Sequence, residues 1–218
     1  MRKIRKTHPP PEYRSWINEN RGTPSYCYDA LPGEVKGTLK RHLLKEQGWL
    51  CAYTGLQVSE ESSHVEHLKP QSSCDVSEDL DYRNLVACFP ADGGDVSYGY
   101  GAPVKGGWWD PARFVSPLDD SCERRFKFSW SGKIAARFAD DEAAVETICQ
   151  IGLDHKALTD LRDAAIHGFL FDTRGHVIGE PEARRLLQAV DRPDGDDRLS
   201  PFCFVLKQLL QRIVEDSG

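Results

Sequence analysis

The sequence lacks any apolar run near the ~18 residues that a transmembrane helix needs, and no apolar stretch follows its basic opening MRKIRK. The first absence excludes a transmembrane helix, and the second excludes a secretory signal peptide. A disulfide framework is also missing, because the seven cysteines are odd in number and irregular in spacing. These absences predict a cytoplasmic protein without membrane contact, and 218 residues suffice for one substantial domain or two small ones.

Positive charge is scarce beyond the first 48 residues. Residues 1–48 carry 10 Lys and Arg against 5 Asp and Glu, residues 49–135 carry 8 against 13, and residues 136–218 carry 10 against 16. Phosphate binding depends on local cations, so the net charge of −6 does not exclude a nucleic-acid enzyme. Two interpretations of Arg2, Lys3, Arg5 and Lys6 are open: they contact phosphate, or they only keep the N-terminal segment exposed to solvent.

The apolar, proline and glycine residues predict an arm, then short strands, then helices. Pro9, Pro10 and Pro11 predict that residues 7–33 form an extended arm without helix. Apolar residues at helical spacing predict helices over residues 32–47, 140–153, 155–170 and 202–213. The remaining expectations are strands at 49–58 and 64–68, a polar loop at 71–83, a strand or helix at 84–88, a loop at 89–111, and a hairpin at 126–138 with Ser131-Gly132 at its turn.

The segment His64-Val65-Glu66-His67-Leu68-Lys69-Pro70 carries the densest group of chemically active side chains. Because side chains alternate along a strand, His64 and Glu66 share one face, and His67 lies on the other unless the strand ends there. Glu66 can ligate a hard cation such as Mg²⁺, and neutral His67 can take a proton from water. Hydrolysis of a phosphodiester needs both functions. A structural role for the two histidines is the open alternative.

Two flanking segments turn this motif into a family resemblance. EQGWLCAY (46–53) precedes the motif, and DYRNLVAC (81–88) follows it. Together they resemble the HNH (ββα-metal) endonuclease family, in particular the PtuB nucleases of Septu-type and retron antiphage systems. The opening MRKIRK and the segment PLDDSCERRFKFSWSGKI (117–134) support this resemblance, which covers residues 1–135.

The resemblance implies an α+β fold with a ββα-metal (HNH) nuclease core at 49–135. A basic arm and helix at 1–48 would contact a partner or DNA, and a helical C-terminal region would occupy 136–218. The implied function is metal-dependent hydrolysis of DNA by the effector of a hetero-oligomeric antiphage complex that includes a PtuA-like ATPase. The alternative is a degenerate HNH module that binds a partner or nucleic acid without cleaving it.

The same resemblance assigns roles to four residues of the motif region. His67 matches the general base, and Glu66 matches the acidic metal ligand just before it. Asn84 matches the central Asn, whose role is to hold the loop that orients the base. His64 matches a polar position two residues before the ligand, where it can support Glu66.

The resemblance is incomplete at the metal ligands. No His or Asn lies between residues 88 and 108, where the family has its third element, so Asp92 is expected as the second ligand of Mg²⁺ or Mn²⁺. Lys105-Gly106 resembles the Lys-Gly that closes the family motif. A structural zinc site is not expected, because Thr54 stands where a CxxC partner of Cys51 would fall, and Cys88 has no partner nearby.

Overall fold

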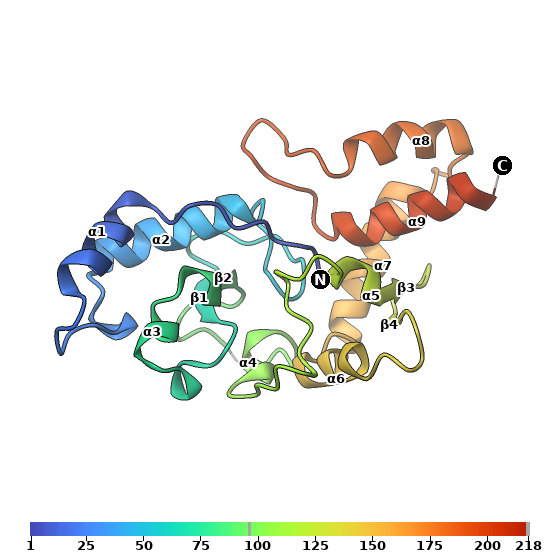
Figure 1. Cartoon of the computed structure of the whole chain (residues 1–218). Coiled ribbons are helices and arrows are strands. Elements are labelled where there is room, and N and C mark those ends of the chain that lie inside the picture. Colours follow the sequence, from blue (N-terminus) through green and yellow to red (C-terminus); the bar gives the residue numbers. More distant parts are fainter. Residues whose placement is uncertain (96, 217–218) are drawn as a thin grey trace.

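The computed structural model describes residues 1–95 and 97–216. They form an α+β fold in which helices surround two small antiparallel sheets (Figure 1). The elements in chain order are α1 (Pro11–Asn20), α2 (Gly33–Glu46), β1 (His64–His67), α3 (Val76–Asp79), β2 (Leu85–Cys88), α4 (Ala102–Lys105), α5 (Cys122–Arg125), β3 (Phe126–Phe128), β4 (Ile134–Ala136), α6 (Glu142–Ile151), α7 (Lys156–Leu170), α8 (Glu180–Ala189) and α9 (Cys203–Asp216). None of the helices in this part of the chain has the length and hydropathy that crossing a membrane requires.

Both sheets are two-stranded and antiparallel. β1 pairs with β2 so that His64 lies opposite Cys88 and His67 lies opposite Leu85. β3 pairs with β4, and Gly132, with a φ of 70°, makes the tight turn between them. The predicted strand at 64–68 and the predicted hairpin at 126–138 are therefore confirmed, and within the segment 84–88 residues 85–88 form a strand, while Asn84 ends a short 3-10 helix.

Three predictions about the first 83 residues are wrong. Pro11 begins α1 inside the predicted arm, because proline tolerates the first turn of a helix. Residues 49–58 form a turn with one isolated bridge between Leu50 and Gln57, and the positive φ of 61° at Trp49 is incompatible with a regular strand. The predicted polar loop at 71–83 contains α3, which Asp75 begins with a capping box.

The four helices predicted from apolar spacing are present as α2, α6, α7 and α9. Capping explains the bounds of α6, because the Asp141 side chain accepts from Ala144 N at its start and Gly152 adopts a left-handed conformation at its end. A further helix, α8, lies alongside α9 (Figure 1).

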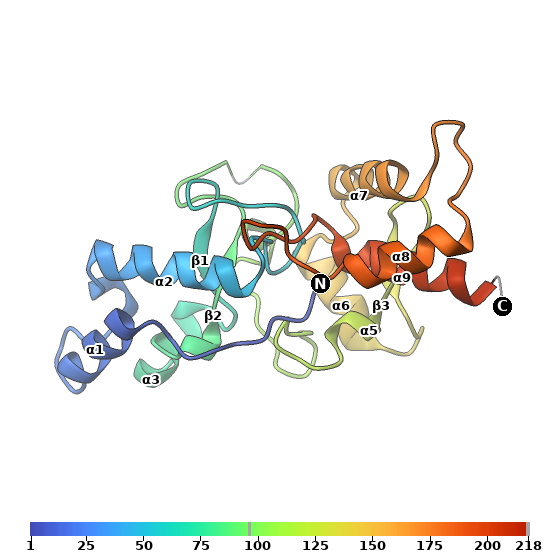
Figure 2. The same cartoon turned by 90° about the horizontal axis from the view of Figure 1, so that it is seen from above.

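Residues 1–7 form an arm that is anchored along its length. Ile4 N donates to Pro117 O at 2.8 Å, and Lys3 N donates to Glu123 Oε1 at 2.8 Å. The side chains of Met1 and Ile4 are buried. Figure 2 shows the arm, in dark blue, running extended from the middle of the molecule to α1. The arm is therefore a fixed part of the fold rather than a freely solvated terminus.

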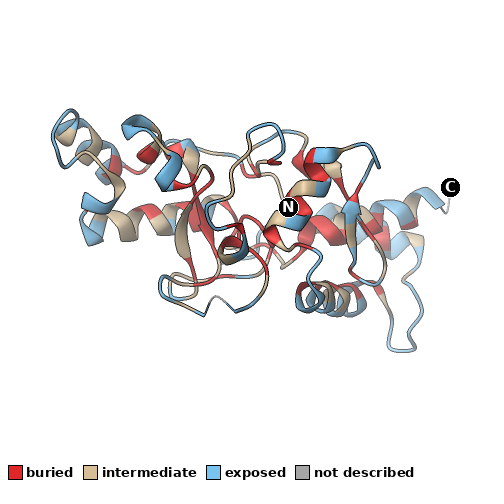
Figure 3. Ribbon diagram, turned by 90° about the horizontal axis from the view of Figure 1, so that it is seen from below, coloured by how far each residue is buried: buried red, intermediate tan, exposed pale blue. Residues whose placement is uncertain are grey.

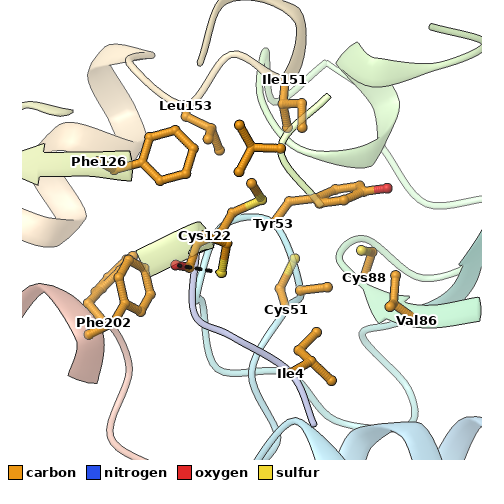
Figure 4. Close-up of a cluster of buried hydrophobic side chains, with 14 of the residues drawn as sticks. Ile4, Cys51, Tyr53, Val86, Cys88, Cys122, Phe126, Ile151, Leu153 and Phe202 are labelled. Atoms are coloured by element: carbon orange, nitrogen blue, oxygen red, sulfur yellow. Dashed lines mark hydrogen bonds between the residues drawn. The ribbon is translucent and has the colours of Figure 1, made fainter. Parts of the chain in front are cut away.

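One hydrophobic cluster runs through the described chain, from the arm to α9. Figure 3 shows its buried residues, in red, along the centre of the molecule. The close-up in Figure 4 brings together Tyr53, Cys88, Phe126 and Phe202, which come from distant parts of the sequence. The core is thus continuous across the predicted boundaries near residues 48 and 135.

Candidate active site

His64 and Glu66 share one face of the β1–β2 hairpin, as the alternation of side chains predicts. Nε2 of His64 lies 3.4 Å from Oε2 of Glu66. Both side chains line a pocket of about 220 Å³, together with Asp92 in the loop after β2 and Pro103 in α4. The structure therefore gathers three of the predicted site residues, His64, Glu66 and Asp92, around one pocket.

The Glu66 carboxylate is held by its other oxygen. Lys105 Nζ donates to Glu66 Oε1 at 2.9 Å and to the main-chain oxygen of His67 at 3.1 Å, and Tyr53 OH donates to the same Oε1 at 3.3 Å. The Lys105 side chain is completely buried. Burial raises the pKa of Glu66, but the hydrogen bond from His64 and the charge of Lys105 outweigh it and hold this pKa below its ordinary value. Glu66 is therefore ionised, with Oε2 beside His64.

The His64 ring is oriented by the loop after β2. Its Nδ1 donates to the carbonyl of Pro90. Since a carbonyl oxygen only accepts, Nδ1 carries a proton, and Nε2, which faces Glu66, donates to its carboxylate when the ring is an imidazolium. Burial lowers the pKa of His64, but the hydrogen bonds to Glu66 and Pro90 and the negative charges of Glu66 and Asp92 raise it above its ordinary value.

His67 lies in a second cluster and does not line the pocket of His64 and Glu66. Its Nε2 donates to the carbonyl of Asp79 at 3.0 Å and lies 3.3 Å from Asp79 Oδ1. The ring of Tyr28 meets the His67 ring edge-on, with 4.8 Å between the ring centroids. This arrangement places the proton on Nε2 and leaves Nδ1 with its lone pair.

Asn84 fixes the loop that supplies the Asp79 carbonyl. Its Oδ1 accepts from Lys69 N at 2.7 Å, and its Nδ2 donates to Lys69 O at 3.1 Å and to Glu78 O at 3.2 Å. The amide thus ties both ends of residues 69–78 to β2. Because Asp79 directly follows Glu78, Asn84 holds the segment whose carbonyl at Asp79 accepts from His67 Nε2.

Tyr28 and Lys105 connect the two clusters. Burial, and next the negative charge of Asp92, raise the pKa of Tyr28, whose ring contacts His67. Lys105 donates both to Glu66 and to the main chain of His67. The side chains of Glu66 and His67 are therefore linked at adjacent positions of β1 although they point to different faces.

A hard divalent cation fits the donors of the pocket. Two neighbouring ligands of an octahedral Mg²⁺ lie about 3 Å apart, close to the 3.4 Å between His64 Nε2 and Glu66 Oε2. The Pro90 carbonyl that holds His64 Nδ1–H is the kind of partner that orients a metal-binding imidazole. No cluster of three or more His, Cys, Asp or Glu suited to a metal occurs within residues 1–95 and 97–216. His64 and Glu66 are thus two candidate ligands, and Mg²⁺ usually keeps several waters beside its few protein ligands.

The two cysteines of the motif region are core residues. Cys51 and Cys88 are both buried, and Figure 4 shows them among apolar side chains. Burial raises the pKa of Cys51, but hydrogen bonds with Cys88, Thr54 and the main chain of Phe89 bring it down to about 6. All seven cysteines are free thiols. Cys51 and Cys88 therefore pack as small side chains of the hydrophobic core.

Four residues of the site carried no predicted role in the sequence: Tyr28, Tyr53, Asp79 and Lys105. Lys105 had been noted only for its resemblance to the family's closing Lys-Gly, and Tyr53 only as part of EQGWLCAY. Comparison with protein-family models and with curated proteins finds no match to this chain.

Proposed function

We propose that this chain is a metal-dependent endonuclease of the HNH (ββα-metal) type that hydrolyses DNA phosphodiester bonds. In this proposal it acts in the cytoplasm as the effector of an antiphage defence complex with a PtuA-like ATPase. The observation that carries the proposal is the hydrogen-bond chain from Asn84 through the Glu78–Asp79 segment to His67 Nε2. It prepares His67 as a base next to the acidic residue of the motif.

His67 supplies the base in this mechanism. With Nε2–H held by the Asp79 carbonyl, Nδ1 accepts a proton from the water that attacks phosphorus. The Asp79 carboxylate, 3.3 Å from Nε2, then stabilises the imidazolium that forms. Asn84 acts through position alone, because it touches the loop and not the imidazole.

Glu66 and His64 would hold the divalent cation, and Asp92, which lines the same pocket, is the expected further ligand. When bound, Mg²⁺ or Mn²⁺ stabilises the negative charge that develops on the leaving oxygen. Lys105 and Tyr53 fix Glu66 Oε1, so that Oε2 stays directed to His64 Nε2. The Pro90 carbonyl keeps His64 in the tautomer whose Nε2 is free of a proton when the ring is neutral.

The test separates the base from the metal ligand. Plasmid cleavage is measured with Mn²⁺ and the purified ATPase partner, and Mn²⁺ binding is measured separately by titration calorimetry. His67→Ala should lower the cleavage rate by about 10²–10⁴ with Mn²⁺ affinity retained, since only the base is lost. Glu66→Ala should lower both.

His176→Ala is the matched control, because His176 is exposed and lies far along the chain in the turn between α7 and α8. It should cleave and bind Mn²⁺ like wild type. Wild-type cleavage by His67→Ala would refute the assignment of the base.

A second candidate function is the degenerate HNH module that binds without cleaving. The observation that favours it is the buried ammonium of Lys105, which already neutralises Glu66. The short α4, only four residues long, is a further departure from the resembled fold. A wild-type protein that binds its partner and DNA, yet cleaves neither plasmid nor single strands with Mg²⁺ or Mn²⁺, would establish this second function.

A further inference from the structure

Away from the candidate active site, the anchored arm borders a long cationic trough. Two adjoining pockets of about 590 and 560 Å³ share Lys3, Arg5 and Asp120 in their walls. We call this surface the arm trough; its cationic walls include Arg2, Lys3, Arg5, Arg83, Arg124 and Lys207. None of these residues lines the pocket of His64 and Glu66. The arm trough is therefore a separate site.

The acidic residues of the larger pocket are all engaged by neighbours. The pairs are Asp120 with Lys3, Asp191 with Lys207, Glu46 with Lys6, and Glu123 with the main-chain N–H of Lys3. By contrast, the guanidinium groups of Arg2, Arg5 and Arg124 make no hydrogen bond or ion pair with any described residue. Three guanidinium groups, each with five donors, are thus left to bind an anion from outside the chain.

The unpaired arginines converge on one place. The pKa of Asp120 is lowered first by its hydrogen bond from Lys3 and also by the positive charges of Arg5 and Arg124. Arg5 comes from the arm and Arg124 from α5, more than a hundred residues later. Folding therefore builds this cluster from distant parts of the chain.

The arm presents its cations on a fixed backbone. Met1 and Ile4 are buried on either side of Arg2, and Ile4 N is bonded to Pro117 O. A disordered basic tail loses conformational entropy when it binds, whereas this arm is already ordered. The arm trough is consequently preorganised for binding.

The shape and chemistry of the trough favour a polymer of phosphates. Residues 2–9 run extended along it and can span about 25 Å at most, compared with 3.4 Å of helix axis per phosphate in one strand of duplex DNA. The rings in its wall are those of His8 and Tyr82, and Lys6 Nζ already covers the Tyr82 ring at 4.2 Å. The walls thus offer mainly charge for a phosphate backbone.

We infer that the arm trough binds the phosphate backbone of nucleic acid without regard to sequence, through Arg2, Arg5 and Arg124. This second contact would hold DNA on the enzyme while the pocket of His64 and Glu66 engages the scissile bond. Only the choice of DNA as the polymer rests on the proposed function.

The test is a salt titration of DNA binding without cleavage. Fluorescence anisotropy of a labelled 20-base-pair duplex is measured with EDTA and with Glu66→Ala in every protein, first at about 50 mM salt. The double variant Arg5→Gln/Arg124→Gln should bind at least tenfold more weakly, because two charge-assisted bonds are lost. The magnitude of the slope of log affinity against log salt should fall by about 2, because each lost phosphate contact removes about one released counterion.

The matched control is Arg184→Gln/Arg185→Gln on α8, which removes the same two charges from exposed arginines paired with Glu180 and Glu182. It should keep the wild-type salt slope. Unchanged affinity and slope in Arg5→Gln/Arg124→Gln would overturn the inference. So would displacement of the duplex by ATP or inorganic phosphate at equal phosphate concentration, which would indicate a small ligand.

Displacement by poly-glutamate as readily as by unlabelled DNA would indicate an acidic protein partner and would also overturn the inference. Because every protein in the assay lacks Glu66, the result is independent of catalysis. A wild-type chain that never cleaves, but whose trough variant loses salt-dependent binding, would refute the proposed function and leave the arm trough intact.

Discussion

Replacing Lys105 by Met removes a buried charge but keeps most of the side-chain volume. The Glu66 carboxylate then loses the ammonium that lies 2.9 Å from Oε1, and the main-chain oxygen of His67 loses a donor. Breaking a buried ion pair from one side leaves an uncompensated charge, which costs about 3 kcal/mol of unfolding free energy. For a chain of this length the corresponding fall in Tm is roughly 6–12 °C.

The loss of unfolding free energy in Lys105→Met should depend on pH. In wild type the pKa of Glu66 is held below its ordinary value, so its contribution to stability is present above the unfolded pKa of about 4.3 and is lost as the pH falls through the lower folded pKa. In Lys105→Met the pKa of Glu66 rises, because burial is opposed only by His64 and by the hydrogen bond from Tyr53. The difference in unfolding free energy between wild type and Lys105→Met should therefore be largest near pH 7 and become smaller toward about pH 4.

Urea denaturation followed by circular dichroism measures both effects. Lys156→Met is the matched control, since Lys156 forms an exposed ion pair with Asp160 and should change stability by less than about 0.5 kcal/mol. The double variant Lys105→Met/Glu66→Gln should recover part of the loss, because no buried charge is left unpaired. Equal stabilities of Lys105→Met and Lys156→Met at neutral pH would refute the reasoning.

Three further outcomes are expected. Asn84→Asp keeps the acceptor for Lys69 N but loses both N–H donors, so the cleavage rate should fall while the fold persists. Asn18→Asp, the same change at an exposed position of α1, should leave the cleavage rate and Tm unchanged. A large drop in Tm for Asn84→Asp alone would mean that Asn84 only stabilises the fold. Gly132→Ala should lower the free energy of unfolding by about 3 kcal/mol, because φ is 70° and the new Cβ would lie 2.7 Å from Asp163 N. Gly168→Ala in α7, which has open space around it, should raise the free energy of unfolding by about 0.5–1 kcal/mol. Equal Tm values for the two variants would contradict this expectation. The chain alone should bind duplex DNA weakly at about 150 mM salt and more tightly with the ATPase partner, and tight, salt-resistant binding by the chain alone in a gel-shift assay would oppose this.

Local signals predicted much of the fold. The alternation in His64-Val65-Glu66-His67 gave β1 and the shared face of His64 and Glu66, and the Ser131-Gly132 turn gave the second hairpin. The prediction of an arm without helix was wrong because Pro11 can be read as a helix breaker or as a helix start. Which reading holds depends on the residues that α1 packs against, and local sequence does not contain them.

The site was predictable to the extent that its residues are neighbours in sequence. Glu66 meets His64 two positions away, but its ammonium partner Lys105 is 39 positions away. Tyr28 reaches His67 from the segment before α2. Such long-range contacts come from tertiary packing, which residue spacing does not encode, so only the resemblance to a family motif drew attention to Lys105.

The anchored arm makes the inferred contact with nucleic acid depend on residues that are synthesised long after the arm itself. Lys3 N is bonded to Glu123, which the ribosome adds 120 residues later. At a translation rate of about 5–20 residues per second, Glu123 is therefore synthesised roughly 6–24 s after Lys3. A nascent chain that ends before Pro117 would carry the cations of the arm without Arg124 or the support of Pro117, so the inferred binding of a phosphate backbone would be acquired only after the middle of the chain has been made.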